Sequence, residues 1–139
     1  MKALLVSLLA LVLITACSQS ESKKKMTLNE QVNALISEAK FEEAMSLLDD
    51  EPSSPEISKL KENVHLKHGI HLIYNSEPSQ MKENANQALR EFIAVLEINP
   101  NNEKAKAETE QILGIYRSFP NRAPAQDVLD KLKELGFNV

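Results

Sequence analysis

Apolar residues recur at spacings of three and four along the chain from Thr27 onward, which is the pattern of amphipathic helices. The strongest run lies between Met81 and Ile98. Six apolar side chains follow this spacing there without interruption: Ala85, Ala88, Leu89, Phe92, Ile93 and Leu96. No segment shows the strict alternation of a half-buried strand. The pattern therefore predicts an all-α fold.

Helix-start and helix-end signals divide this pattern into six helices in three antiparallel pairs. Thr27 and Glu30 have the spacing of a capping box, and Ser54 followed by Pro55 is typical of a helix start. Gly136 before Phe137 is typical of a helix end. The predicted helices cover residues 28–39, 41–48 and 55–75, then 81–98, a fifth capped by Asn101 or Asn102 and reaching Tyr116, and a last one through Val128 to Leu135.

The helix predicted over residues 55–75 carries apolar residues on two faces. One stripe begins with Ile57, Leu60 and Val64 and continues through His68 and His71. The second stripe lies on another face and consists of Leu66, Ile70 and Ile73. A helix that is apolar on two faces lies between neighbours, so we expect this one to be central in the fold.

The first residues differ from the rest of the chain. Lys2 precedes an uncharged run from Ala3 to Ile14, which is too short to span a bilayer because a spanning helix needs about 20 apolar residues. The run suits the hydrophobic segment of a secretory signal peptide. The alternative is a short uncleaved anchor in which Cys17 is incidental.

The residues Ile14, Thr15, Ala16 and Cys17 resemble the lipobox of bacterial lipoproteins, in which an aliphatic residue and two small ones precede the acceptor cysteine. The resemblance implies that the Cys17 thiol receives a diacylglycerol and that the chain is cut before it. The new amino terminus is then acylated, with palmitate as a typical chain. Two or more acyl chains anchor a protein stably where one does not.

This reading divides the chain into a signal peptide over residues 1–16, a polar tether over 17–26 and a helical domain over 27–139. Ser18 after the acceptor cysteine implies, by the sorting rule of Gram-negative lipoproteins, the periplasmic face of the outer membrane. The Lys23–Lys25 cluster of the tether is read as a solvated spacer, with contact to lipid headgroups as the alternative.

Composition narrows the classes of function. The net charge is −4, and removing residues 1–16 takes away only Lys2 among charged groups, which leaves −5. An acidic chain with few aromatic residues argues against nucleic-acid binding. Cys17 is the only cysteine, so no intramolecular disulfide is expected. The sequence contains no glycine-rich phosphate loop and no nucleophile elbow, so we expect no enzymatic activity and no cofactor.

Part of the helical domain resembles tetratricopeptide repeats. Ala88, Phe92, Val95 and Pro100 follow the pattern of the second helix of a repeat, with valine in place of alanine. The segment 39–48 resembles an earlier copy, and Gly69 resembles the small residue where paired helices touch. The linker over 76–80 is longer than in the family, and Thr109 and Glu110 depart from its pattern. The resemblance implies a short α-α superhelix, with an ordinary helical hairpin bundle as the alternative.

In that family the first helix of each pair lines a concave groove. Residue by residue, the resemblance implies that Asn63, Leu66, Ile70 and Ile73 face the groove, together with Lys104 and Gln111 from the following helix. Leu66, Ile70 and Ile73 fit a covered core equally well. The implied partner is an envelope protein, and the implied role is an interaction scaffold or assembly factor.

All three histidines, His65, His68 and His71, lie three residues apart. With Glu62 they are each rotated about 60° from the last on a helix, so neighbours share a face but the whole set does not. We therefore expect His68 and His71 to be partly buried packing residues that hydrogen-bond nearby. One alternative is a pH-sensitive contact, and another is a periplasmic metal-binding or metal-sensing lipoprotein that uses His65, His68 and His71.

Overall fold

The computed structural model describes residues 26–75, 77–119 and 121–139. The predicted signal peptide, the lipobox and Cys17 lie outside the described residues, as do Ser18 and the Lys23–Lys25 cluster. The predictions made for them therefore stay predictions.

The described residues form six α-helices and one short 3-10 helix, with no strand among them. This confirms the all-α prediction. The helices are α1 (Leu28–Ser37), α2 (Phe41–Asp49), α3 (Pro55–Tyr74), η1 (Pro78–Gln80), α4 (Met81–Ile98), α5 (Glu103–Arg117) and α6 (Gln126–Glu134). Within the part of the chain that the structure describes, no helix has both the length and the apolarity needed to cross a membrane.

Side chains that the sequence marks as caps begin three of the helices. Thr27 and Glu30 form the complete capping box at α1. Ser54 Oγ accepts a hydrogen bond from the amide of Ile57 at 3.2 Å. Asn102, rather than Asn101, caps α5, because its Oδ1 accepts from the amide of Ala105 at 2.9 Å. Each bond satisfies one of the amides that a helix start leaves without a partner.

Ala39 was predicted to continue the first helix, and this prediction is wrong. α1 ends at Ser37, and Ala39 has φ 57° and an exposed side chain. The amide of Lys40 reaches back to the carbonyl of Leu35 at 2.9 Å, which closes the helix with a left-handed residue. The link before α2 is short, so the chain reverses through this conformation. Gly136 makes the corresponding turn after α6, as predicted, with φ 86°.

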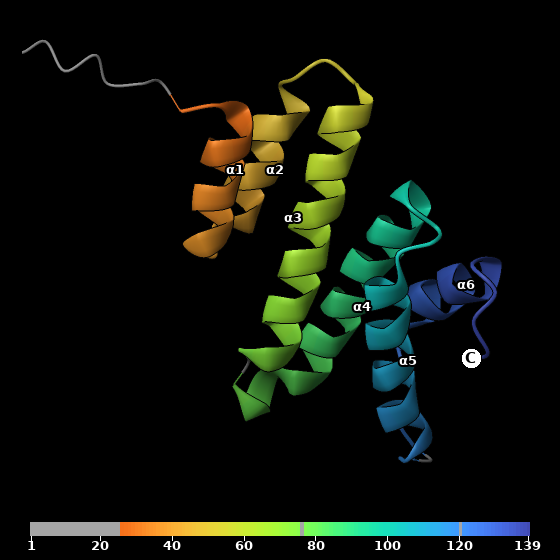
Figure 1. The fold of residues 1–139 in the computed structure, drawn as a ribbon. Helices are drawn as coiled ribbons and strands as arrows, with labels where there is room; N and C mark the ends of the chain where they lie inside the picture. The colour runs from red at the N-terminus through yellow and green to blue at the C-terminus, as the bar shows by residue number, and fades with distance from the viewer. Residues whose placement is uncertain (1–25, 76, 120) are drawn as a thin grey trace, which may run out of the picture.

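α3 lies in the middle of the molecule, with α1 and α2 on one side and α4 and α5 on the other (Figure 1). The N-terminal core cluster contains Val32, Phe41, Ala44, Leu48, Ile57, Leu60 and Val64. The C-terminal core cluster contains buried residues of α4, α5 and α6, and Leu66, Ile70 and Ile73 pack against it. The two apolar faces of α3 therefore serve two cores, as the sequence predicts.

α4 is the helix on which the other helices of the C-terminal half pack. It packs closely on α3, where the backbone of Gly69 meets the ring of Phe92, and it also packs against α5 and α6. The guanidinium of Arg90 binds Asp127 of α6 through both carboxylate oxygens, with Nη2–Oδ2 at 2.9 Å. This exposed bidentate pair links the start of α6 to α4.

Candidate functional site

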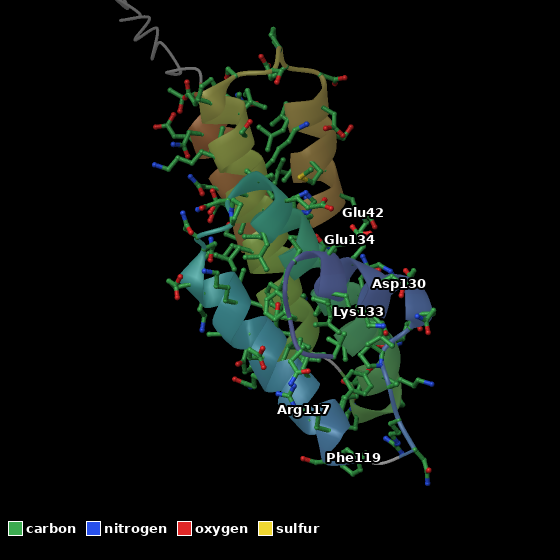
Figure 2. All side chains as sticks on the ribbon, turned by 90° about the vertical axis from the view of Figure 1, so that its right-hand side faces the viewer. Glu42, Arg117, Phe119, Asp130, Lys133 and Glu134 are labelled. Carbon is green, nitrogen blue, oxygen red and sulfur yellow. The ribbon has the colours of Figure 1, made fainter. Side chains whose placement is uncertain are left out.

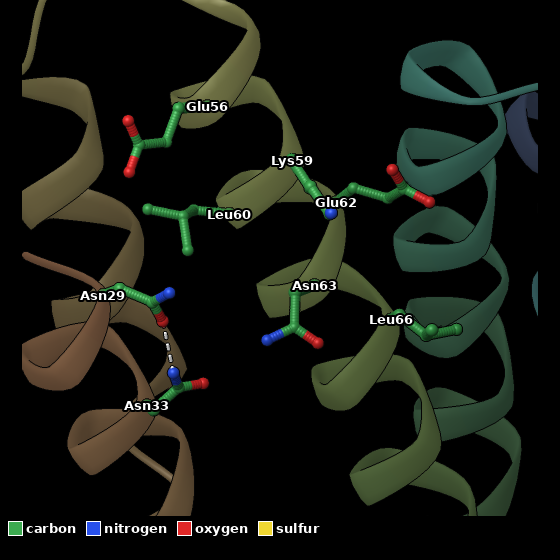
Figure 3. A pocket seen from close by; sticks show the side chains of 8 residues that line it. All are labelled: Asn29, Asn33, Glu56, Lys59, Leu60, Glu62, Asn63 and Leu66. Atoms are coloured by element: carbon green, nitrogen blue, oxygen red, sulfur yellow. Dashed lines mark hydrogen bonds between the residues drawn. The ribbon is translucent and has the colours of Figure 1, made fainter.

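A groove of about 510 Å³ lies between α1 and α3 (Figure 3). Most of the side chains that line it are polar, and they come from two helices. Its lining residues are Asn29 and Asn33 from α1, and Glu56, Lys59, Leu60, Glu62, Asn63 and Leu66 from α3. Amide groups both donate and accept hydrogen bonds, so this lining suits a ligand with many hydrogen-bonding groups.

Helical spacing brings these polar side chains together. Asn29 and Asn33 are one turn apart on α1, and the amide of Asn33 donates to Asn29 Oδ1. Glu56 and Asn63 are about two turns apart on α3, which places them on one face. In the close-up, the Asn63 side chain extends from α3 into the space beside Asn29 and Asn33 (Figure 3).

Several of these groups are not engaged within the protein. Glu62 is an exception, because its Oε1 accepts from the amides of Asn99 at 2.8 Å and Asn102 at 2.7 Å. By contrast, the side chains of Glu56, Lys59 and Asn63 make no hydrogen bond or ion pair with any described residue. Their polar atoms are therefore available to a ligand in the groove.

A second polar cluster joins the end of α3 to α5. Tyr74 donates its hydroxyl proton to Glu108 Oε2 at 3.1 Å, and Gln111 Nε2 donates to the Tyr74 hydroxyl at 3.4 Å. Lys104 Nζ lies 2.6 Å from Glu108 Oε1. The hydrogen bond and the charge of Glu108 raise the pKa of Lys104. Tyr74 and Asn63 are about three turns apart on α3 and so share a face.

The residues assigned to a groove from the sequence fall into three places. Asn63 and Leu66 line the groove, although Leu66 also packs against the C-terminal core cluster. Ile70 and Ile73 are half-buried against that cluster, which is the alternative left open from the sequence. Lys104 and Gln111 belong to the Tyr74 cluster.

Sequence reasoning missed two parts of this face. Asn29 and Asn33 line the groove, and their spacing of four on the polar side of a predicted helix was the available signal. Glu108 is almost fully buried, at 3% exposure. The spacing of Glu108, three residues after Ala105 and four before Ile112, places it on the buried face of α5, and this was the available signal. Its partner Tyr74 comes from another helix and could not be read from the local sequence.

The histidines meet a carboxylate that the sequence did not indicate. His65 Nδ1 lies 2.8 Å from Glu91 Oε2, and His68 Nδ1 lies 3.2 Å from Glu91 Oε1. Gln87 Nε2 donates a third hydrogen bond to Glu91 at 3.0 Å. Burial by itself raises the pKa of Glu91, but the hydrogen bonds and charges of His65 and His68 outweigh it and lower that pKa to about 2.

His68 and His71 also pack against an aromatic ring. The imidazole of His68 stacks on Phe41, with ring centroids 4.7 Å apart and an interplanar angle of 12°. His71 meets the same ring at 5.3 Å with a tilt of 55°. Both side chains are half-buried against this ring, as packing residues are, and the expected polar partner is found for His68 in Glu91. Among the described residues, no group of three or more His, Cys, Asp or Glu side chains is placed to hold a metal ion.

An apolar hollow of about 280 Å³ lies at the far end of α5, bordered by Leu113, Phe119 and Leu129 among others. Figure 2 shows Arg117 and Phe119 at this end, away from Asp130, Lys133 and Glu134 of α6. Arg117 borders the hollow and is engaged by Glu110 and by the carbonyl of Asn138. The groove beside α1 is therefore the better candidate for a polar ligand.

No protein-family model matches the chain, and no curated protein and no solved structure is significantly similar to it.

Proposed function

We propose that this protein is a lipid-anchored scaffold of the bacterial envelope that binds a protein partner through the face formed by α1, α3 and α5. The anchor is the acylated Cys17 that the lipobox resemblance implies, and the helices form a short tetratricopeptide-like stack. The role is positional and involves no reaction on the partner. Acyl chains confine the domain to a membrane surface, which raises the local concentration of whatever it binds.

The groove between α1 and α3 is the observation that carries this proposal. It offers the unengaged polar groups of Lys59, Asn63 and Glu56 beside the apolar side chains of Leu60 and Leu66. The carboxamide of Asn63 matches the donor and acceptor of a peptide group. The backbone of an extended protein segment therefore supplies the hydrogen-bonding partners that these side chains lack within the protein.

Two packing features support the tetratricopeptide-like arrangement. The close contact of Gly69 with Phe92 occurs where the family has its small residue and its aromatic one. α5 then packs on α4, as the first helix of a further pair does in a stack. The first helices of the successive pairs are α1, α3 and α5, and they carry both polar clusters of the candidate site.

Site-specific crosslinking in native membranes tests the binding face. A photoreactive amino acid at Asn63 is expected to trap a protein adduct, and the same residue at Asp130, which is exposed on α6, is expected not to trap it. Asn33→Lys places a long cation in the groove and is expected to abolish the adduct. Equal yields from the Asn63 and Asp130 positions would reject this face as the binding site.

Metabolic labelling with an alkyne analogue of palmitate tests the anchor separately. The wild-type chain is expected to incorporate the label and to fractionate with membranes. Cys17→Ser removes the only cysteine, so both properties are expected to be lost. Labelling that persists in the Cys17→Ser variant would contradict the lipidation part of the proposal. That result would not bear on the groove as the binding site.

A further inference from the structure

The apolar hollow at the end of α5 is built from three segments of the chain. They are the last turns of α5, the link between α5 and α6, and α6 with the C-terminal residues. Leu113 is buried and Leu129 is half-buried, whereas Phe119 and Val139 are 50% and 40% exposed. The hollow therefore joins core side chains to exposed apolar ones, and an apolar group of a partner would cover both.

This hollow is separate from the groove between α1 and α3. Figure 1 shows α5 ending on the side of the molecule away from α1 and α2, and Figure 2 places Arg117 and Phe119 at that end. The residues that line the groove and those that line the hollow do not overlap. A partner can therefore occupy one of the two surfaces without contacting the other.

Two arginines border the hollow, and their contacts differ. Arg117 donates from Nη2 to Glu110 at 3.1 Å and from Nη1 to the carbonyl of Asn138 at 3.2 Å, so it attaches the C-terminal residues to α5. Arg122 lies over the ring of Phe119, with Cζ 5.4 Å from the ring centroid. This cation–π contact holds the guanidinium beside the hollow and leaves its N–H donors available.

Arg122 lacks the carboxylate partner that the other two arginines have. Arg90 binds Asp127 and Arg117 binds Glu110. For the Arg122 side chain, by contrast, no hydrogen bond or ion pair is found among the described residues. A guanidinium presents a planar set of donors that matches a carboxylate, so the group that Arg122 lacks is a carboxylate.

Glu83 is another charged group near this end of the molecule. Burial raises the pKa of Tyr116, which lines the hollow, and the charges of Glu83 and Arg122 act on that pKa in opposite directions. Within the part of the chain that the structure describes, no ion pair joins Glu83 to Arg122. The guanidinium therefore stays open to a carboxylate from outside the chain.

The size of the hollow restricts what it holds. Sites that enclose a whole small molecule measure about 300–1000 Å³. The hollow measures about 280 Å³, which is below that range, and two of its walls are exposed. It therefore suits an apolar side chain that belongs to a larger partner.

We propose that the hollow is a second protein-binding site, which takes a leucine-sized side chain while Arg122 pairs with a carboxylate next to it in the same segment. An aspartate directly before a leucine supplies both groups. The leucine side chain gains by burial against Leu113 and Leu129, and the carboxylate accepts two parallel hydrogen bonds from the guanidinium. This inference does not depend on the groove or on the lipid anchor.

Methyl NMR of the full chain in lipid nanodiscs, titrated with capped peptides, tests the site. The acidic probe is acetyl-Gly-Asp-Leu-Gly-amide, and the neutral probe has Asn in place of Asp. The acidic probe is expected to shift the methyl signals of Leu113, Leu129 and Val139 to saturation and to leave that of Leu60 in the groove unchanged. It is expected to bind about two- to fivefold more tightly than the neutral probe, which is the size of an exposed ion pair.

Arg122→Gln is expected to bind the two probes equally, with the affinity that wild type has for the neutral one. Arg122 is exposed, so the variant is expected to fold. Lys133→Gln is the matched control, because it removes one positive charge from an exposed position of α6 away from Phe119, and it is expected to keep the preference for the acidic probe (Figure 2).

A preference for the acidic probe that survives in Arg122→Gln would overturn the proposal, as would the absence of saturable shifts at the methyl groups of the hollow. Shifts of these methyl groups that depend on protein concentration alone would also overturn it, because a second copy of the chain would then cover the hollow. None of these results would change the crosslinking expected at Asn63, so this site and the groove are tested separately.

Discussion

The aromatic ring of Phe92 lies directly against the backbone of Gly69, so that a β-carbon built on Gly69 would come within 2.6 Å of Phe92 Cε1. Phe92 is fully buried and belongs to the C-terminal core cluster. The absence of a side chain at Gly69 therefore allows α3 and α4 to approach each other at this point. A short glycine contact between two long helices leaves no space for an added methyl group unless the ring moves.

Gly69→Ala is expected to destabilise the protein. Alanine is the better helix former by about 1 kcal/mol, but forcing an extra methyl into a packed core costs about 1–3 kcal/mol, and the steric cost wins because the ring is enclosed. Gly114→Ala is the control: the nearest atom to its added β-carbon is a flexible Arg117 nitrogen at 4.0 Å. Urea unfolding is expected to show a lower midpoint for the first variant and a higher one for the second.

Ala39→Gly is expected to stabilise the protein by about 0.5–1 kcal/mol. Ala39 has φ 57°, where an L side chain is strained and glycine is not, and its side chain makes no core contact that would be lost. Ala107→Gly, at an exposed position within α5, is the matched control and is expected to lose about 1 kcal/mol. Thermal melts of both variants measure these changes in stability. Equal destabilisation of the two variants would contradict the strain at Ala39.

Asn86→Ala is expected to weaken the attachment of α6 to α4. Asn86 is buried, its Oδ1 accepts from the amide of Ala125 at 2.7 Å, and its Nδ2 donates to the Tyr116 hydroxyl at 3.3 Å. Losing these partners leaves buried polar groups unsatisfied, at a cost of about 1–3 kcal/mol. Hydrogen exchange is expected to accelerate most in α6.

Thr109→Val gives the contrasting case for buried polar groups. The Thr109 hydroxyl is buried and has no hydrogen-bond partner among the described residues. Replacing it with a methyl group of similar shape is therefore expected to leave stability unchanged or to raise it by about 1 kcal/mol. A loss as large as that of Asn86→Ala would show that the hydroxyl makes a bond in solution.

The Glu91 carboxylate is expected to contribute to acid stability. Its pKa is lowered from 4.5 to about 2 in the folded protein, so its contribution is present above pH 4.5 and is lost as the pH falls toward 2. Wild type is expected to exceed Glu91→Gln by about 1–3 kcal/mol at pH 5, as for hydrogen bonds to a charged group, and the two are expected to converge near pH 2. Denaturant titrations at several acidic pH values measure this, and parallel curves would contradict it.

Zinc is expected to leave the melting temperature unchanged. His65 and His68 direct Nδ1 at Glu91, while His71 lies against Phe41, so the three rings do not converge on one point. A ligand that binds only the folded state raises stability in proportion to its affinity, so a site with micromolar affinity would be visible in a melt. A rise that disappears when all three histidines are replaced with asparagine would restore the metal-binding alternative.

The sequence by itself determined the helices and the central place of α3. The bounds of α4, the caps at Thr27 and Ser54, and the turn at Gly136 are local features, because each depends on residues within one or two turns. The two apolar faces of α3 could also be predicted from the sequence, because a helix that is buried on two sides must carry an apolar stripe on each of them.

The tertiary structure decided which polar groups meet. Glu91 is 26 residues from His65 and Glu108 is 34 residues from Tyr74. Both carboxylates stand at the spacing of buried positions, Glu91 between Ala88 and Val95 and Glu108 between Ala105 and Ile112, but no local pattern identifies the partner that each one meets. Ala39 shows the same limit within a turn, where helical spacing suggested continuation and the packing of α2 on α1 required reversal. Spacing along a helix specifies which face a side chain occupies, whereas the partner on that face depends on how the helices pack.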